Sequence, residues 1–291
     1  MDMYEKRIKL REYLLSNECV PLMGAYDVLS AKIVEQTGFP VVYTGSLVTG
    51  ASQFGLPDVG LVTLNDLLGL AREIAKETDI PLVSDADSGW YHAANIWRTV
   101  HEFESAGVSG IHIEDTVFGK HTTHKAVLLD QDVMCQRVRA CVDARKDKNF
   151  MIIARTDAMY LNEDMEDAVR RINAYLDAGA DAGFIVFRGS IKELKEFRSR
   201  IHGPLITTSV DFQDSLAEET EAGANMSVYW PLTIYAAFKA VKYVCEKFWE
   251  TKDATQLQEY CFDEGALNSV LPYKRLYEGV EKYKVLDQFK K

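Results

Sequence analysis

The sequence predicts an α/β fold, a (β/α)8 TIM barrel, on three observations. Eight short apolar runs typical of buried β-strands alternate with longer amphipathic patterns typical of helices. Several expected helices end in Ala-Gly, the usual stop before a following strand, at 106–107, 178–179 and 222–223. The first run is followed by Gly-Ala-Tyr-Asp at 24–27, which lacks the glycine-rich phosphate turn of an open, doubly wound sheet.

The eight expected strands are 20–25, 41–45, 81–87, 110–115, 150–157, 182–187, 204–210 and 225–230. The expected helices between and after them are 63–76, 93–106, 130–145, 164–178, 191–199, 213–222 and 232–248. No linker rich in proline, glycine or serine divides these units, so we expect residues 1–250 to form one catalytic barrel domain. Residues 251–291 are expected to be a helical extension, with helices at 256–262 and 273–289, that packs in an oligomer.

Composition and net charge indicate an ordinary globular protein and argue against several kinds of partner. The chain has 291 residues, of which 47% are hydrophobic and 26% charged, as in ordinary globular proteins. A net charge of -11 argues against nucleic acid or an anionic membrane as the partner. No apolar run approaches the roughly 20 residues that span a bilayer. Five cysteines, an odd number without CxxC spacing, favour a reducing compartment, and we expect a cytoplasmic protein.

Acidic side chains end two consecutive expected strands, as Asp-Ala-Asp at 85–87 and His-Ile-Glu-Asp at 112–115. Side chains alternate along a strand, so the two acids of the first segment share one face, as do His112 and Glu114. Buried carboxylates are costly without a compensating cation. The pattern therefore predicts a site for a hard divalent cation with oxygen ligands, and it favours Mg2+ over Zn2+. The alternative is that these acids cap the following helices or face water.

Six strings in order are similar to a known family: Gly-Ala-Tyr-Asp-Val-Leu-Ser-Ala at 24–31, Tyr-Thr-Gly-Ser at 43–46, Gly-Leu-Pro-Asp at 55–58, Asp-Ala-Asp-Ser-Gly at 85–89, His-Ile-Glu-Asp at 112–115 and Ala-Arg-Thr-Asp at 154–157. The series resembles the isocitrate lyase and phosphoenolpyruvate mutase superfamily over roughly residues 10–245. The resemblance implies a barrel whose last helix is exchanged between subunits, in a homotetramer built as a dimer of helix-swapped dimers. It also implies Mg2+, with Mn2+ as a substitute, and a small anionic 2-oxo or 2-hydroxy acid as substrate.

The same resemblance assigns roles by position. Asp85 would bind the metal directly, while Asp58, Asp87 and Glu114 would act directly or through water. The substrate contacts that the resemblance implies are Tyr43, Gly45, Ser46, Asp85, His112 and Arg155. In that role Arg155 would hold the carboxylate of the substrate with its planar fork. The alternative is that Arg155 is only an ion-pair partner for a neighbour such as Asp157.

The segment after the fourth expected strand departs from the family. Lyases of the superfamily carry Lys-Arg-Cys-Gly-His there, and mutases a lysine followed by Asn-Ser. This chain has Gly-Lys-His-Thr-Thr-His-Lys at 119–125, so Lys120 and His124 match the lyase ends while Thr122 replaces the cysteine. A threonine hydroxyl does not exchange protons at neutral pH without strong activation. We expect Lys120, Thr122 and His124, with Glu114, to be the catalytic group, although a polar surface loop is the open alternative.

The far side of the expected pocket also departs from the family. The sixth strand ends in Phe-Arg at 187–188, where lyases present a glutamate and mutases a histidine. The seventh reaches Thr208 where lyases carry an Asn-x-Thr-Glu-Phe string. We expect Arg188 and Thr208 to bind a distal group of the substrate, such as a carboxylate or phosphonate. The alternative for Arg188 is a solvated surface charge.

Three functions follow from these residues. The leading hypothesis is a Mg2+-dependent lyase that cleaves a C–C bond in a small 2-hydroxy or 2-oxo acid through an enolate-like intermediate, in which the cation stabilises the developing oxyanion. The second is a C–P bond enzyme, a phosphonopyruvate hydrolase or phosphoenolpyruvate mutase. The third is a catalytically silent homologue that binds an oxo acid without turning it over.

Overall fold

The computed structural model describes residues 1–117, 126–261 and 264–284. Eight parallel strands close into a barrel in chain order, from β1 to β8 and back to β1. The strands are β1 Val20–Gly24, β2 Val41–Thr44, β3 Leu82–Asp85, β4 Gly110–Glu114, β5 Met151–Thr156, β6 Ala182–Phe187, β7 Leu205–Ser209 and β8 Met226–Tyr229. All eight expected strands are present with ends within two residues, and the predicted (β/α)8 TIM barrel is confirmed.

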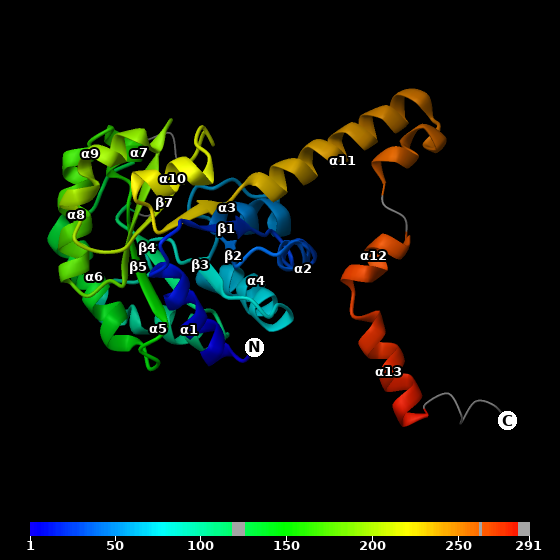
Figure 1. The fold of residues 1–291 in the computed structure, drawn as a ribbon, viewed down its shortest axis with the longest axis horizontal. Helices are drawn as coiled ribbons and strands as arrows, with labels where there is room; N and C mark the ends of the chain where they lie inside the picture. Colours follow the sequence, from blue (N-terminus) through cyan, green and yellow to red (C-terminus); the bar gives the residue numbers. More distant parts are fainter. Residues whose placement is uncertain (118–125, 262–263, 285–291) are drawn as a thin grey trace. The chain divides into compact units, whose positions relative to one another are not determined.

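Helices connect the strands around the outside of the barrel (Figure 1). The first half contains α1 Met3–Leu14, α2 Val28–Thr37, α3 Ser46–Thr49, the π-helical turn η1 Gly50–Phe54, α4 Leu64–Glu77, the 3-10 turn η2 Ala93–Asn95, α5 Trp97–Ser105 and α6 Gln131–Ala144. The second half contains α7 Ala158–Asn162, α8 Met165–Asp177, η3 Ile191–Glu193, α9 Leu194–Phe197, η4 Arg198–Arg200, α10 Leu216–Ala222, α11 Leu232–Thr251, η5 Ala254–Tyr260, α12 Glu264–Val270 and α13 Tyr273–Tyr283.

Local sequence explains how these helices begin and end. Asp27, Thr63 and Ser215 each accept a backbone N–H of the first helical turn, in a capping box that starts α2, α4 and α10. The Ala-Gly stops that the sequence predicted are confirmed, because Gly107 and Gly223 have φ values of 86° and 87°. The helix expected at 93–106 is shorter than predicted: its first residues form the turn η2, and α5 begins at Trp97.

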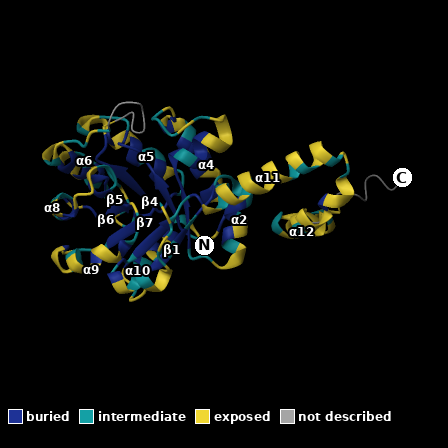
Figure 2. Ribbon diagram, turned by 90° about the horizontal axis from the view of Figure 1, so that it is seen from above, coloured by how far each residue is buried: buried dark blue, intermediate teal, exposed yellow. Residues whose placement is uncertain are grey.

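The barrel separates two apolar cores. Inward side chains of the strands, such as Tyr43, Met151 and Phe184, pack with Leu10 and Leu14 of α1, so this helix lies against the barrel interior. The outward side chains pack beneath the surrounding helices in the larger core. Figure 2 shows buried strands inside helices whose outer faces are exposed.

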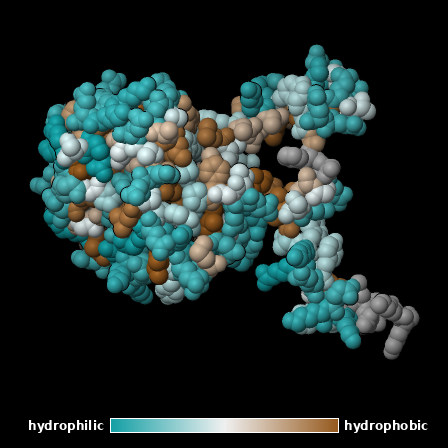
Figure 3. All heavy atoms as spheres, viewed as in Figure 1, coloured by the Kyte–Doolittle hydropathy of each residue, from teal (hydrophilic) through white to brown (hydrophobic). Residues whose placement is uncertain are grey.

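The chain divides into two compact units, Met1–Ile234 and Tyr235–Lys291. The sequence-based boundary between a barrel domain 1–250 and an extension 251–291 stays a prediction. Within the second unit, α11 buries none of its residues in the single chain, although Phe238, Val241 and Trp249 are large and apolar. Figure 3 shows apolar side chains along this helix. Among the described residues, no helix combines the length and apolar character that crossing a bilayer requires.

Candidate active site

Strand alternation and register bring the predicted site residues together at the carboxyl end of the barrel. Because Val83, Met151 and Ile153 belong to the interior core, Asp85 and Arg155 fall on the inward side of their strands. The register pairs Asp85 of β3 with His112 of β4. It likewise pairs Glu114 of β4 with Arg155 of β5, and Arg155 with Phe184 of β6. Catalytic groups of such barrels lie at this end.

Three carboxylates form the centre of the site. Asp85, Asp87 and Glu114 are buried, with 3%, 4% and 2% of their surface exposed, and each offers an oxygen within 4.8 Å of the other two. The backbone N–H of Asp87 donates to Oδ1 of Asp85 at 2.8 Å, and the N–H of Glu114 donates to the carbonyl of Asp87 at 2.8 Å. The turn that carries Asp87 is thereby tied to both neighbouring acids.

Asp58, the fourth predicted ligand, lies beside the triad rather than within it. The hydroxyl of Ser46 lies 3.0 Å from Oδ2 of Asp85 and 3.3 Å from Oδ1 of Asp58, so it links the two acids. The N–H of Ser46 also donates to Asp85 at 3.2 Å. At Gly45 a Cβ would lie 3.0 Å from the hydroxyl of Tyr43 and 3.4 Å from Cβ of Asp85, so a larger residue would crowd this side of the site.

Arg155 is a cation that contacts the triad. Its Nε and Nη2 donate to the two carboxylate oxygens of Asp157 at 2.7 and 2.9 Å, and its Nη1 lies 3.3 Å from Oε2 of Glu114. Burial alone lowers the pKa of Arg155, but the charges of Asp157 and Glu114 outweigh burial and hold that pKa well above its usual value. The ion pair that the sequence offered as an alternative is thus present, and carboxylate binding by Arg155 stays a prediction.

Tyr43 and His112 form a buried pair beneath the triad. Their rings are stacked, and Oη of Tyr43 lies 2.9 Å from Nε2 of His112. On the other side of the imidazole, Nδ1 lies 3.6 Å from Oδ1 of Asp85. Phe184 packs edge-on against the same ring, with centroids 5.2 Å apart. The arrangement fixes the orientation of the imidazole next to an acid of the triad.

Behind the triad, Asp115 faces away from Glu114 and joins the ends of β4 and β5. Its carboxylate accepts hydrogen bonds from the hydroxyls of Thr156 and Tyr175, both at 2.7 Å, and from the N–H of Asp157 at 3.0 Å. Burial raises the pKa of Asp115 to about 6, although the hydrogen bond from Thr156 opposes that rise. The network fixes the backbone position of Asp157 and therefore the partner of Arg155.

The two predicted contacts for a distal group lie on β7 and just after β6. Val186 belongs to the interior core, so alternation places Arg188 on the inward side, although its side chain is exposed. Its Nε donates to the carbonyl of Tyr160 at 3.3 Å, and its guanidinium lies 4.3 Å from the ring centroid of the same tyrosine. Thr208 is buried and donates its hydroxyl to the carbonyl of Val228 at 2.6 Å.

The predicted catalytic residues Lys120, Thr122 and His124 lie outside the described residues. The chain around them is described on both sides, where Thr116 forms an antiparallel bridge with Leu128. Sequence reasoning missed the hydroxyl of Thr116, which donates to Oε1 of Glu114. The sequence could have indicated this contact, because Thr116 stands only two residues after Glu114. It also missed Phe184, which alternation along the sixth strand would have placed inward.

The triad fits a hard divalent cation. Asp85, Asp87, Glu114 and Asp157 bring four carboxylates together with the guanidinium of Arg155, and the three triad acids are almost fully buried. Such an excess of buried negative charge is costly without a cation. Carboxylate oxygens are the ligands that Mg2+ and Mn2+ prefer, and no thiol or imidazole belongs to the triad. The residues present therefore suit Mg2+.

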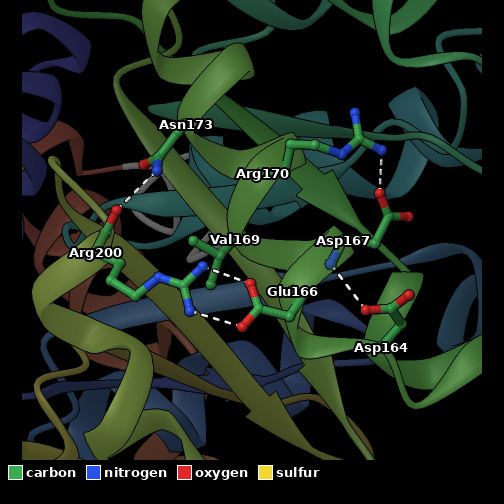
Figure 4. Close-up of a pocket in the computed structure, with 7 residues that line it drawn as sticks. All are labelled: Asp164, Glu166, Asp167, Val169, Arg170, Asn173 and Arg200. Carbon is green, nitrogen blue, oxygen red and sulfur yellow. Dashed lines mark hydrogen bonds and ion pairs between the residues drawn. The ribbon is translucent and has the colours of Figure 1, made fainter.

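A separate surface pocket of about 570 Å³ lies on the outside of the barrel, along α8 (Figure 4). Its charged side chains are paired with one another: Arg200 with Glu166, and Arg170 with Asp167. These residues come from α8 and η4 rather than from the strand ends that carry the triad. The pocket is distinct from the candidate active site, and its cations and acids largely neutralise each other.

Comparison with known proteins places the chain in a family. The family model described as phosphoenolpyruvate phosphomutase matches residues 10–249. A 2-methylisocitrate lyase of Shewanella oneidensis is 36% identical over 79% of this chain and 80% of its own length. A 2,3-dimethylmalate lyase of Eubacterium barkeri is 35% identical over 80% of this chain and 82% of its own length. The family model therefore covers all eight strands of the barrel.

Solved structures agree with this assignment. The crystal structure of phosphoenolpyruvate phosphomutase from Streptomyces platensis superposes with a TM-score of 0.89 at 29% identity, over 95% of this chain and 99% of that one. The phosphonopyruvate hydrolase complex with oxalate and Mg2+ has a TM-score of 0.86 at 27% identity, over 97% and 99% of the two chains. The chain is therefore a member of the phosphoenolpyruvate phosphomutase family, within the isocitrate lyase and phosphoenolpyruvate mutase superfamily.

Proposed function

We propose that this chain is a Mg2+-dependent lyase that cleaves a carbon–carbon bond in a small 2-hydroxy or 2-oxo carboxylic acid through an enolate-like intermediate. The buried triad of Asp85, Asp87 and Glu114 beside Arg155 carries the proposal. The 2-methylisocitrate and 2,3-dimethylmalate lyases among the relatives support carbon–carbon cleavage over other chemistry on the same barrel. We expect that Mn2+ can substitute for Mg2+ in supporting activity.

Residues from two parts of the barrel are proposed to bind the substrate carboxylate. Arg155, held by Asp157, turns a guanidinium edge toward Glu114 and the triad, where a substrate carboxylate would sit. Gly45 and Ser46 would contact the same carboxylate from the start of α3. A bound Mg2+ would supply a positive charge next to the oxygen on which negative charge develops during cleavage.

Cleavage of a 2-hydroxy acid needs a base and an acid. The base takes the hydroxyl proton as the carbon–carbon bond breaks, the bonding electrons pass to the departing enolate, and an acid then returns a proton to carbon. We assign this proton transfer to the segment with Lys120, Thr122 and His124. Tyr43 and His112, joined by a hydrogen bond, are proposed to contact the substrate from below.

The identity of the substrate depends on its distal group. Arg188 follows the sixth strand on the inward side, with its guanidinium stacked on Tyr160, and Thr208 lies on the seventh. An arginine at this place favours a second anionic group on the substrate, a carboxylate or a phosphonate. We therefore propose a dianionic or trianionic acid as substrate.

We further propose that the protein assembles as a homotetramer of helix-swapped dimers. The support is α11, a helix of 20 residues whose apolar side chains, Phe238 and Trp249 among them, are more than 60% exposed in the single chain. Large exposed apolar faces mark contacts with another protein surface. A partner subunit of the same sequence is the proposed cover.

A combined proton and phosphorus NMR assay tests the proposed function. The purified protein is incubated with and without Mg2+ in the presence of 2-methylisocitrate, 2,3-dimethylmalate, oxaloacetate or phosphonopyruvate. We expect Mg2+-dependent appearance of pyruvate, glyoxylate or another acid formed by carbon–carbon cleavage from one of the first three compounds.

Two other outcomes would contradict the proposal. Phosphate or phosphoenolpyruvate formed from phosphonopyruvate would assign the chain to C–P chemistry, a candidate that the similarity to phosphonopyruvate hydrolase favours. Binding of oxalate without turnover of any of the four compounds would identify a catalytically silent homologue.

A further inference from the structure

The turn between β3 and η2 carries an acid of the triad in a strained backbone. Asp87 and Trp90 have φ values of 45° and 56°, and Gly89 between them has 86°. Residues with side chains rarely adopt this left-handed region, so the backbone is strained there. At Gly89 a Cβ would lie 2.8 Å from Cδ1 of Ile96. Such a turn persists only where its surroundings fix it.

Two side chains from the outer helices hold the carbonyl groups of this turn. Nη1 of Arg137, on α6, donates to the carbonyl of Ser88 at 2.6 Å. The hydroxyl of Thr99, on α5, donates to the carbonyl of Gly89 at 2.8 Å, and Thr99 is fully buried. The carbonyls belong to the two residues that directly follow Asp87, so the contacts fix the peptide planes of the turn immediately after it.

The inner side of the same turn is fixed by the triad. Asp87 donates its N–H to Asp85 and accepts the N–H of Glu114 at its carbonyl, both at 2.8 Å. The turn is therefore held on one side by the acids and on the other by two helices. Loss of the outer contacts would let the strained residue relax toward ordinary φ values and move its carboxylate away from the other two.

We infer that Arg137 and Thr99 are positioning residues for the metal site: they clamp the 87–90 turn so that the Asp87 carboxylate meets those of Asp85 and Glu114. The inference rests on the proposed Mg2+ site and assigns to it two residues that do not touch the ion. Partners of ligand residues typically change metal affinity about 10- to 100-fold when they are removed.

Metal affinity gives the first test. Mn2+ is titrated into the parent protein and into Thr99→Val and Arg137→Met, and free Mn2+ is followed by electron paramagnetic resonance. We expect each variant to bind Mn2+ about 10-fold more weakly. Arg137→Lys, which keeps one donor, should recover part of the affinity.

Matched controls separate this effect from general loss of stability. Thr78→Val removes a buried hydroxyl that donates to the carbonyl of Ile74, and Arg198→Met removes an arginine that donates to the carbonyls of Gly223 and Ile201. Both controls should bind Mn2+ like the parent. Parent-like affinity in Thr99→Val and Arg137→Met, or equal weakening in the controls, would overturn the inference.

Hydrogen exchange of the metal-free protein gives an independent test. The amides of Gly89 and Glu114 donate to the carbonyls of Ala86 and Asp87, so their exchange reports opening of the turn. We expect exchange about fivefold faster in Thr99→Val and Arg137→Met, the effect of one lost hydrogen bond. Unchanged exchange in both variants would overturn the inference, even if their affinity for Mn2+ is lower. A parent protein that binds no Mn2+ would instead contradict the proposed function.

Discussion

At the scale of single residues, Asp85 is the acid on which the site depends. It accepts hydrogen bonds from Ser46 and from the backbone of Asp87, and it belongs to the triad. We expect Asp85→Ala to abolish Mg2+-dependent turnover, a loss of about 1000-fold or more, while the circular dichroism spectrum stays that of the parent. Steady-state kinetics measure the loss. Asp177→Ala, at an exposed acid on α8, is the control, and retained activity in Asp85→Ala would refute the metal assignment.

Asp157 is expected to act through Arg155. Its two carboxylate oxygens accept two N–H groups of Arg155, so Asp157→Asn removes a charge-assisted contact and frees the guanidinium to rotate. We expect the KM of the substrate and the inhibition constant of oxalate to rise about 10-fold, the effect of one such hydrogen bond. Asp147→Asn removes the partner of another buried arginine, Arg7, and should leave both constants unchanged. Equal KM values in parent and Asp157→Asn would contradict this role.

Strand alternation made part of the site predictable from the sequence. It placed His112 and Glu114 on one face of their strand, and the register then brought Asp85 beside His112. The contact from Ser46 to Asp85 and the left-handed φ of Asp87 were not predictable. Both depend on how loops from different strands meet, which a local pattern does not encode.

At the scale of elements, α1 closes one end of the barrel through buried cations. Arg7, which is 1% exposed, donates to the carbonyls of Val108 and Glu104 and pairs with Asp147. Arg7→Met leaves these acceptors unsatisfied in the interior, so we expect a loss of about 3 kcal/mol of unfolding free energy. Urea denaturation measures the loss, with Lys9→Met on the exposed side of α1 as the control. A loss no larger than that of the control would contradict the role of Arg7.

The same contact predicts a pH dependence of stability. Burial raises the pKa of Asp147, but hydrogen bonds from Asn149 and Arg7 outweigh burial and hold the pKa below its usual value. A carboxyl with a depressed folded-state pKa contributes stability above its unfolded pKa, near 3.9, and loses it as the pH falls through the folded value. We expect the stability difference between parent and Asp147→Asn to be constant from about pH 7 to 5 and to shrink below about pH 4. Urea midpoints over this range measure it, and a difference independent of pH would contradict the assignment.

Elements with strong periodicity were predictable, and those set by tertiary contacts were not. The strands follow from short apolar runs, and the helix α4 follows from its amphipathic pattern and its capping box. The start of α5 was predicted four residues too early, because residues 93–95 form a 3-10 turn before it. Buried Lys6 and Arg7 on α1 look like surface cations in the sequence, because their carbonyl acceptors come from distant parts of the chain.

At the scale of the whole molecule, the closed barrel was predictable because eight strand patterns alternate with helices and the first strand lacks the glycine-rich turn of an open, doubly wound sheet. Assembly as a tetramer stays a prediction, and it comes from the family resemblance. The described single chain leaves Phe238 and Val241 of α11 67% and 63% exposed, and a helix with such a face is not stable in water by itself.

Oligomeric state gives the last prediction. Light scattering coupled to size-exclusion chromatography should give about four times the chain mass of 32.9 kDa for the parent protein. Phe238→Glu places a charge on the apolar side of α11, and a charge without a partner in an apolar interface is strongly unfavourable. We expect this variant to have a lower mass and a melting temperature that depends on protein concentration less steeply than that of the parent, because fewer chains separate when it unfolds. Lys239→Glu, the next residue and exposed, is the control that should remain tetrameric. A parent that elutes as a 32.9 kDa monomer, or a Phe238→Glu variant of parental mass, would show that α11 does not bind a second copy of the chain.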